Sequence, residues 1–164
     1  MNLTLPRVAH EHHERLLQHV DGMPGFGDRL MTADVEDVRG GADDLHAFLS
    51  GTLIPHIDAA EGTLYPELER MLQNRHSMSP MRHEHDQVRR LVAEFGRLVG
   101  LIGSEPPSIG RRLALRRIVF ELYAILKVHM AEEEAYLHVV EHGVTDDVAE
   151  VMAAALDHPG FRSV

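Results

Sequence analysis

The sequence predicts an all-α fold: an up-down-up-down four-helix bundle with a short C-terminal fifth helix. Apolar residues recur every three or four positions through most of the 164 residues, which is the spacing of one helix face. Strand signals are nearly absent, since no alternating apolar run and no Asn-Gly or Asp-Gly turn lies between β-branched segments. Stretches with Pro and Gly separate four segments of roughly 20 residues or more, and a helix of that length spans about 30 Å.

The four long helices are expected at about 6–23, 32–74, 79–100 and 109–142. Residues 24–28 contain one proline and two glycines and are expected to form a loop, and residues 103–108 a connector. A short fifth helix is expected from about 145 to 156. We therefore predict a four-helix bundle domain over residues 1–144, with residues 145–164 forming a short helix and tail packed on it.

Proline and glycine predict local features within these helices. In the second helix, irregularities are expected at Gly40-Gly41, Gly51 and Pro55. Pro66 should kink the same helix, because proline removes a backbone donor and clashes with the preceding turn. Ser79 is expected to cap the third helix, with Pro80 at the first helical position.

Composition narrows the classes of function. The formal net charge is −10 with His neutral, which argues against a nucleic-acid partner because such partners require a basic face. There is no Cys, which excludes disulfides, thiolate metal sites and thiol nucleophiles. Neither a signal peptide nor a membrane span is expected, so a cytoplasmic location is predicted. The compositional outlier is the 13 His residues, because His is the commonest metal ligand.

A charged residue lies where the fourth helix should have a core residue. The apolar stripe of that helix, from Leu115 through Leu126 to Leu137, passes through His129 and Glu133. An ionised carboxylate in a dry core is very costly unless it is paired or bound to a metal. His and Glu at positions i and i+4 of one inward face are an arrangement by which helical bundles hold metals.

The other three helices each place one His on the inward face. His13 shares its stripe with Leu16 and Val20, whereas His83 falls on the outer face of the third helix. The inward residues on the second and third helices are His56, Glu61 and His85. Four inward His and two inward carboxylates predict a shared metal site. The segment 56–66 also resembles the segment 129–139 as a weak internal repeat.

With these residues in place, the chain resembles the hemerythrin-like (HHE cation-binding) family of non-haem di-iron four-helix bundles, over about residues 6–142. The family pattern is His on the first helix, His-x-x-x-Glu on the second, His on the third and His-x-x-x-Glu on the fourth. His13 fits the first position within His-His-Glu-Arg-Leu-Leu, and His85 fits the third within Met-Arg-His-Glu-His-Asp-Gln-Val. His129 and Glu133 fit the fourth, and Leu-Tyr-Pro at 64–66 resembles the end of the family's second motif.

The second motif departs from this pattern. Ala60 stands where the family has Glu, and Glu61 comes five residues after His56. A five-residue step resembles the His-x4-Asp spacing on the last helix of respiratory hemerythrins. On an ideal helix Glu61 would lie about 140° from His56, and a wide turn next to Gly62 would bring it back to the inward face.

The resemblance implies a ligand set for one or two metal ions: His13, His56, Glu61, His85, His129 and Glu133. Respiratory hemerythrins carry a second His on the third helix, where this chain has Met81 and Arg89. The site is therefore poorer in His than that of an oxygen carrier and resembles the bacterial sensor, peroxidase or iron-handling variants. Tyr65 and Tyr136 are further oxygen-ligand candidates, although core positions suit both.

The function implied is a metal protein, with two iron ions or else zinc or manganese, that binds, senses or detoxifies O2, NO or H2O2. Catalytic turnover stays open, and no residue is assigned a catalytic role. Two alternatives stay open as well: a metal-poor helical module that acts through protein contacts, and a simple iron or zinc holder without turnover. A homodimer or another protein partner is compatible with the sequence, whereas nucleic acid and membrane partners are not expected.

Overall fold

The computed structural model describes residues 5–141, with side chains described from residue 13 to residue 138. Every element in this range is helical: α1 Leu5–Arg29, α2 Val35–Phe48, η1 Leu49–Leu53, α3 Ile54–Ala59, η2 Ala60–Leu64, α4 Tyr65–Met71, α5 Ser79–Val99 and α6 Ile109–Glu141. The all-α prediction is therefore confirmed for the described residues. The predicted fifth helix near 145–156 lies outside them.

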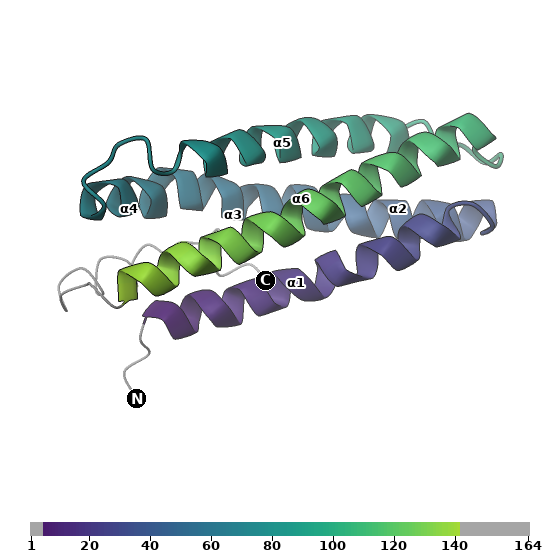
Figure 1. Ribbon diagram of the computed structural model, residues 1–164. Coiled ribbons are helices and arrows are strands. Elements are labelled where there is room, and N and C mark those ends of the chain that lie inside the picture. Colours follow the sequence, from purple (N-terminus) through teal and green to yellow (C-terminus); the bar gives the residue numbers. More distant parts are fainter. Residues whose placement is uncertain (1–4, 142–164) are drawn as a thin grey trace.

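Four rods lie side by side to form a helical bundle (Figure 1). One rod is α1, the second runs from α2 to α4 without a break, and α5 and α6 are the other two. Around the bundle, α1 packs against α6, α6 against α5, α5 against α2, and α2 against α1. Each rod thus contributes one face to a common interior. Over residues 5–141, no helix combines the length and the apolar character that a membrane crossing requires.

The first rod is longer than predicted, because residues 24–28 are helical and not a loop. The apolar stripe of α1 continues through Met23 and Phe26 to Leu30, all of which are buried. Burial of these side chains outweighs the helix-breaking tendency of Pro24. Gly27 marks a close approach to α6, since a Cβ added there would lie 2.8 Å from the ring of Phe120. The glycine that suggested a turn therefore serves helix packing.

The second rod contains two five-residue π turns, η1 and η2, at the irregularities predicted near Pro55 and Pro66. The irregularity predicted at Gly40-Gly41 is wrong, because α2 is regular from Val35 to Phe48, and Gly41 instead lets the ring of Phe26 approach α2 closely. Each π turn ends two residues before a proline, Pro55 or Pro66. Proline cannot donate a backbone hydrogen bond, and its ring clashes with the carbonyl four residues earlier. The wide turns avoid both problems: the N–H of Ile54 donates to the carbonyl of Leu49, and that of Tyr65 to the carbonyl five residues earlier. Both sites share the pattern Gly-Thr-Leu-x-Pro, at 51–55 and 62–66.

The ends of the rods are defined by a cap and by burial. Asp34 caps α2, as its carboxylate accepts from the N–H of Asp37 at 2.9 Å. The prediction that Ser79 caps α5 is wrong, because Ser79 is already helical and Met78 precedes the helix without a side-chain cap. Met78 is fully buried, so apolar burial and not capping positions this start. The predicted end of α6 at residues 142–143 lies outside the described residues.

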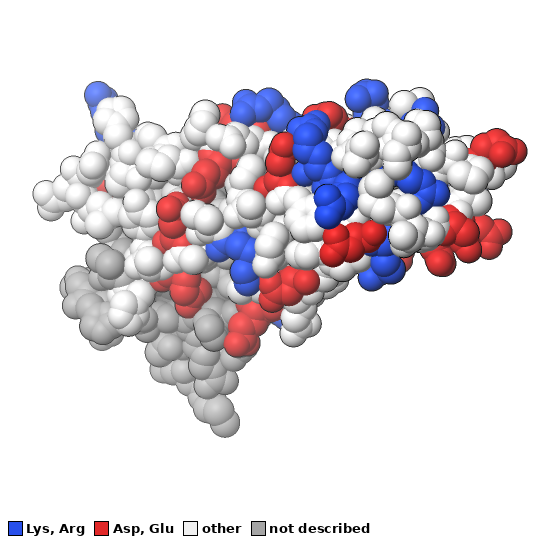
Figure 2. Space-filling model, turned by 45° about the vertical axis from the view of Figure 1, so that its right-hand side comes forward, with Lys and Arg blue, Asp and Glu red and all other residues white. Residues whose placement is uncertain are grey.

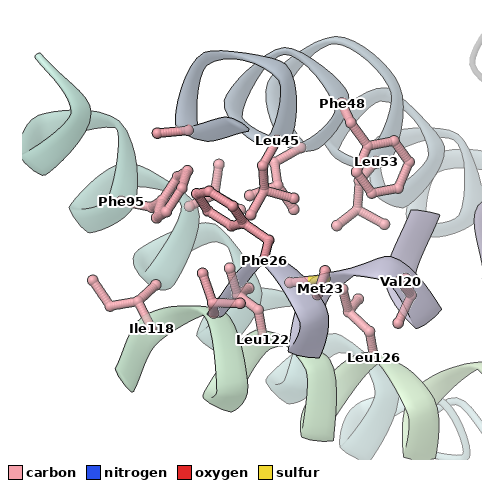
Figure 3. Close-up of a cluster of buried hydrophobic side chains, with 14 of the residues drawn as sticks. Val20, Met23, Phe26, Leu45, Phe48, Leu53, Phe95, Ile118, Leu122 and Leu126 are labelled. Carbon is pink, nitrogen blue, oxygen red and sulfur yellow. The ribbon is translucent and has the colours of Figure 1, made fainter. Parts of the chain in front are cut away.

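The core consists of two apolar clusters separated by a polar layer. The larger cluster joins all four rods, and Figure 3 shows part of it, including Phe26, Phe48, Phe95 and Leu122. A smaller cluster packs Tyr65, Leu68 and Met78 near the start of α5, together with Leu137 of α6. Along α5 and α6 the inward His residues lie between members of the two clusters. The polar layer is therefore enclosed by apolar side chains on both sides.

Charged side chains of both signs are mixed on the face shown in Figure 2. Arg116 donates to Asp28 at 3.0 Å, and Arg117 donates to Glu94 and to Glu121 at 2.9 Å. These two basic residues of α6 are thus matched by carboxylates of α1, α5 and α6. Such exposed pairs contribute little stability individually.

Candidate metal centre

Five of the six predicted site residues meet in the polar layer. The side chains of His13, His56, His85, His129 and Glu133 come from all four rods, and none of these residues is more than 3% exposed. They are the buried polar residues among the described positions. His83 is exposed, as its place on the outer face of α5 predicted.

Glu133 lies at the middle of this group. Its Oε2 is 3.2 Å from the Nε2 of His13, 3.6 Å from that of His56 and 3.9 Å from that of His129. No side chain satisfies hydrogen-bonding angles at either oxygen of Glu133, although both oxygens are buried. A buried carboxylate in this state is costly unless a cation or a set of donors compensates it. Three of the residues, His13, His56 and Glu133, bring ligand atoms within 4.8 Å of one another.

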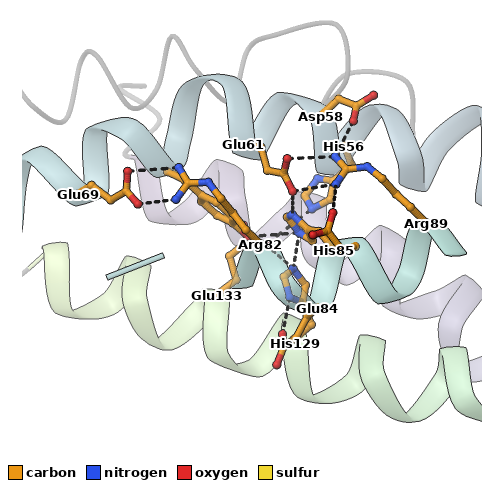
Figure 4. Close-up of polar contacts among 12 residues, drawn as sticks. His56, Asp58, Glu61, Glu69, Arg82, Glu84, His85, Arg89, His129 and Glu133 are labelled. Carbon is orange, nitrogen blue, oxygen red and sulfur yellow. Dashed lines mark hydrogen bonds and ion pairs between the residues drawn. The ribbon is translucent and has the colours of Figure 1, made fainter. Parts of the chain in front are cut away.

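A second pair of imidazoles lies beside the first. The Nε2 atoms of His85 and His129 are 3.0 Å apart (Figure 4). The hydroxyl of Tyr65 is 3.3 Å from the Nε2 of His85. The ring of Tyr65 stacks on that of His85 at 5.4 Å between centroids. Burial, together with the nearby Glu133 carboxylate, raises the pKa of Tyr65 above its usual value. Its hydroxyl therefore keeps its proton and donates to His85.

Glu61 reaches this layer from the π turn η2, but on the outer side of His85. Its Oε1 lies 2.7 Å from the Nδ1 of His85, and Arg89 donates to both of its oxygens at 3.0 and 3.1 Å. Arg89 also donates to Asp58 at 2.8 Å. Burial alone would raise the pKa of Glu61, but the bonds from Arg89 and His85 lower it below its usual value. The wide turn thus brings Glu61 to the site, where it orients an imidazole.

Three of the four imidazoles have a carboxylate on their outer nitrogen. Besides the pair of His85 and Glu61, the Nδ1 of His13 lies 3.0 Å from Glu134, and the Nδ1 of His129 lies 2.9 Å from Glu84. An ionised carboxylate only accepts, so each Nδ1 carries the hydrogen and donates it. Each pair joins two different rods. Carboxylates in this position fix the ring and leave Nε2 available to a metal.

Charge is distributed unevenly over the four imidazoles. Burial would lower the pKa of His13, but Glu133 and Glu134 outweigh it and raise the pKa to about 9. Burial lowers the pKa of His56, and burial together with His129 lowers the pKa of His85 to about 4. Burial opposes ionisation of Glu133, yet the contacts with His13 and His56 hold its pKa well below its usual value. These shifts favour an ionised Glu133 carboxylate beside a protonated His13 imidazole.

These donors fit a metal ion. With hydrogens on their Nδ1 atoms, the Nε2 atoms of His85 and His129 direct lone pairs at each other across 3.0 Å. Two nitrogens without hydrogens repel at this distance, unless one ring carries a second hydrogen or both nitrogens bind the same cation. Imidazole nitrogen and carboxylate oxygen suit iron, manganese and zinc. Glu133 also suits a metal ion. Its carboxylate is buried without a well-formed hydrogen bond, and a bound cation would compensate its charge.

Helical spacing alone does not indicate two further residues of this layer, Glu84 and Glu134, because neither lies on an apolar stripe. A carboxylate directly next to an inward His or Glu, as in Glu84-His85 and Glu133-Glu134, was the available signal. Tyr65 was considered only as a ligand candidate, whereas here its hydroxyl contacts His85.

One comparison with known proteins identifies the family. A model described as the Hemerythrin HHE cation binding domain matches residues 4–107, which is more than half of the chain. The chain belongs to this family. The part that matches the HHE domain contains His13, His56 and His85, and it ends before α6. His129 and Glu133 lie on α6, outside the matched residues, and the packing of the bundle brings them beside the other three imidazoles. No curated protein and no solved structure matched the chain.

Proposed function

We propose that this HHE domain holds iron, as a pair of ions, and that the centre binds O2, NO or H2O2 in order to sense or detoxify it. The observation that supports this proposal most directly is the buried carboxylate of Glu133, with three imidazole nitrogens within 3.9 Å of one of its oxygens. A purely structural core would not concentrate four imidazoles around an anion at this energetic cost.

Two donor groups suit two ions. His13 and His56 share one side of Glu133, while His85 and His129 form the neighbouring pair, with their Nε2 atoms 3.0 Å apart. The two oxygens of Glu133 would serve both groups. Glu61 becomes a second bridging carboxylate only where its bonds to Arg89 and His85 open; otherwise it acts through His85.

The chain's own residues prepare this centre for a small molecule. Glu61, Glu84 and Glu134 hold three imidazoles by their Nδ1 atoms, so these ligands need little reorganisation on binding a metal. The two apolar clusters limit access of water. When bound, iron would supply reversible binding or redox chemistry toward O2, NO or peroxide. Tyr65 can donate a hydrogen bond to a group near His85.

The proposal includes an up-down-up-down topology. The connections at 30–34, 72–78 and 100–108 are short compared with the rods. Short connections between packed helices favour antiparallel neighbours, which would bring one inward His from each rod to the same level.

The test is elemental analysis with an optical spectrum, on protein loaded anaerobically with ferrous iron and purified without a His-tag column. We expect about two irons per chain and charge-transfer bands that change on addition of peroxide or NO. His56→Ala and Glu133→Ala should each abolish stoichiometric iron. His83→Ala removes an exposed imidazole from α5 and should leave the iron content unchanged.

Each result separates the candidate functions. Full iron content in both His56→Ala and Glu133→Ala would refute the assignment of the centre. Stoichiometric metal without any response to peroxide or NO would indicate a metal holder. No bound metal in the unmodified chain would favour a helical interaction module, for which the substitution of Ala60 for Glu is the supporting feature.

A further inference from the structure

A pocket between α1 and α6 reaches one residue of the centre. Its volume is about 230 Å³, and its wall includes the ligand candidate His13. Three other pockets of the described residues touch no residue of the centre. The rest of the wall between α1 and α6 consists of Glu14, Leu17, Lys127, Met130, Ala131 and Glu134. We call it the α1–α6 pocket.

The wall of this pocket suits small, neutral molecules. Leu17, Met130 and Ala131 supply an apolar surface, and the exposed part of the pocket is mostly apolar. At the mouth, Lys127 is matched by Asp21 at 3.0 Å. The carboxylate of Glu134, with 43% of its side chain exposed, adds negative charge that lowers the local concentration of anions.

The pocket ends at His13, and Glu134 on the outer nitrogen of that imidazole is part of its wall. His13 presents its Nδ1 to Glu134 and its Nε2 to Glu133, at 3.0 and 3.2 Å. A molecule in the pocket therefore lies beside the imidazole that contacts the central carboxylate. Ala131 is exposed on α6, and its small side chain leaves the mouth open.

We propose that the α1–α6 pocket is the access route by which small neutral molecules such as O2 reach the centre, and that Ala131 sets its width. The role of the pocket as an access route rests on the proposed function of the centre. The test of the pocket uses metal-free protein, so the access route and the proposed function can be refuted separately.

Dissolved O2 is the probe, because it is paramagnetic and speeds the relaxation of nearby methyl groups. The measurement is made on metal-free protein with ¹³C-methyl methionine, under O2 pressure. Met130, Met78 and Met81 are all at most 2% exposed, so exposure alone predicts equal effects. We expect O2 to speed the methyl relaxation of Met130 several-fold more than that of Met78 and Met81. A relaxation enhancement at Met130 no larger than at Met78 and Met81 would overturn the proposal.

Two matched variants test the route itself. Ala131→Trp fills the mouth, whereas Ala124→Trp places the same ring two turns away on the exposed face of α6. Ala131→Trp should reduce the effect at Met130 to the level at Met78, and Ala124→Trp should leave it unchanged. Both variants are first compared with the parent chain by circular dichroism. A large effect at Met130 that survives in folded Ala131→Trp would show that O2 arrives by another path, against the proposal.

The selectivity for neutral molecules is tested with azide as the anionic probe. Addition of azide to the metal-free protein should leave the methyl shift of Met130 unchanged. A saturable shift would show that anions enter the pocket and would overturn this part of the inference. Absence of bound iron together with a large O2 effect at Met130 would instead refute only the proposed function.

Discussion

Replacing Glu133 with Gln in the metal-free protein should sharply lower the pKa of His13. Gln has nearly the same shape as Glu, so the substitution removes the central charge with little change in packing. In the parent chain the pKa of His13 is raised to about 9 although the imidazole is buried. Burial alone acts in the opposite direction, because it disfavours the charged form.

The geometry sets the size of the effect. The Oε2 of Glu133 lies 3.2 Å from the Nε2 of His13, and two unit charges at that distance attract by about 5 kcal/mol at an effective dielectric constant of about 20. The attraction corresponds to a fall in the pKa of His13 of at most about 4 units when the charge of Glu133 is removed. Glu134 remains in the variant, but its side chain is 43% exposed and its charge is screened by solvent. We therefore expect the pKa of His13 to fall by roughly 2 units or more.

The assay is an NMR titration of the imidazole Cε1–H signals, with His13 assigned by the loss of its signal in His13→Gln. Glu134→Gln is the matched control and should lower the pKa of His13 by clearly less. A larger decrease in Glu134→Gln than in Glu133→Gln would refute the view that Glu133 is the main charge of the layer. An unchanged pKa in both would contradict the described contacts.

Three other predictions follow from the same structure. Without metal, stability should be greatest near pH 6.5, the ordinary pKa of His. Between pH 6.5 and about pH 4 the unfolded chain binds a proton at His85 that the folded chain does not bind, so stability falls as the pH is lowered. Between pH 6.5 and about pH 9 the folded chain holds a proton on His13 that the unfolded chain has released, so stability falls as the pH is raised. Urea unfolding against pH measures this, and His13→Gln should remove the loss of stability on the alkaline side. Glu61→Gln should weaken metal affinity about 10- to 100-fold without changing the number of ions bound. Metal titration followed by elemental analysis measures both quantities. Loss of one ion would contradict the prediction, because Glu61 would then be a direct ligand. Gly41→Ala should destabilise the fold by about 1–3 kcal/mol, because its Cβ would lie 2.5 Å from a buried aromatic ring. At Gly22 no atom lies within 4 Å of an added Cβ, so Gly22→Ala should stabilise α1 by about 0.5–1 kcal/mol. A lower melting temperature for Gly22→Ala than for Gly41→Ala would contradict the packing described.

Helical periodicity was sufficient for the all-α class of the fold and for the inward faces of its rods. The positions of His13, His56, His85, His129 and Glu133 on apolar stripes follow from spacing alone, and all five are buried in the structure. Periodicity is informative here because each helix of a bundle has one inward face. A residue spaced three or four positions from the apolar residues of that face is therefore buried together with them. The same rule correctly left His83 exposed.

Local signals failed where tertiary packing opposed them. Pro24 and two glycines predicted a loop, but burial of Phe26 and Leu30 keeps α1 helical to Arg29. The serine predicted to cap α5 lies inside the helix, because Met78 is buried just before it. Turn and cap preferences amount to about 1 kcal/mol, which is less than burial of a large apolar side chain contributes.

The sequence by itself determined which residues face the interior, because the period of a helix is a local property. Only the tertiary structure decided what these residues contact. The placement of Glu61 on His85, of Glu84 on His129 and of Glu134 on His13 depends on the relative height and rotation of neighbouring rods. Those quantities are set by packing between segments as far apart as 121 residues, and no spacing within a single helix records them.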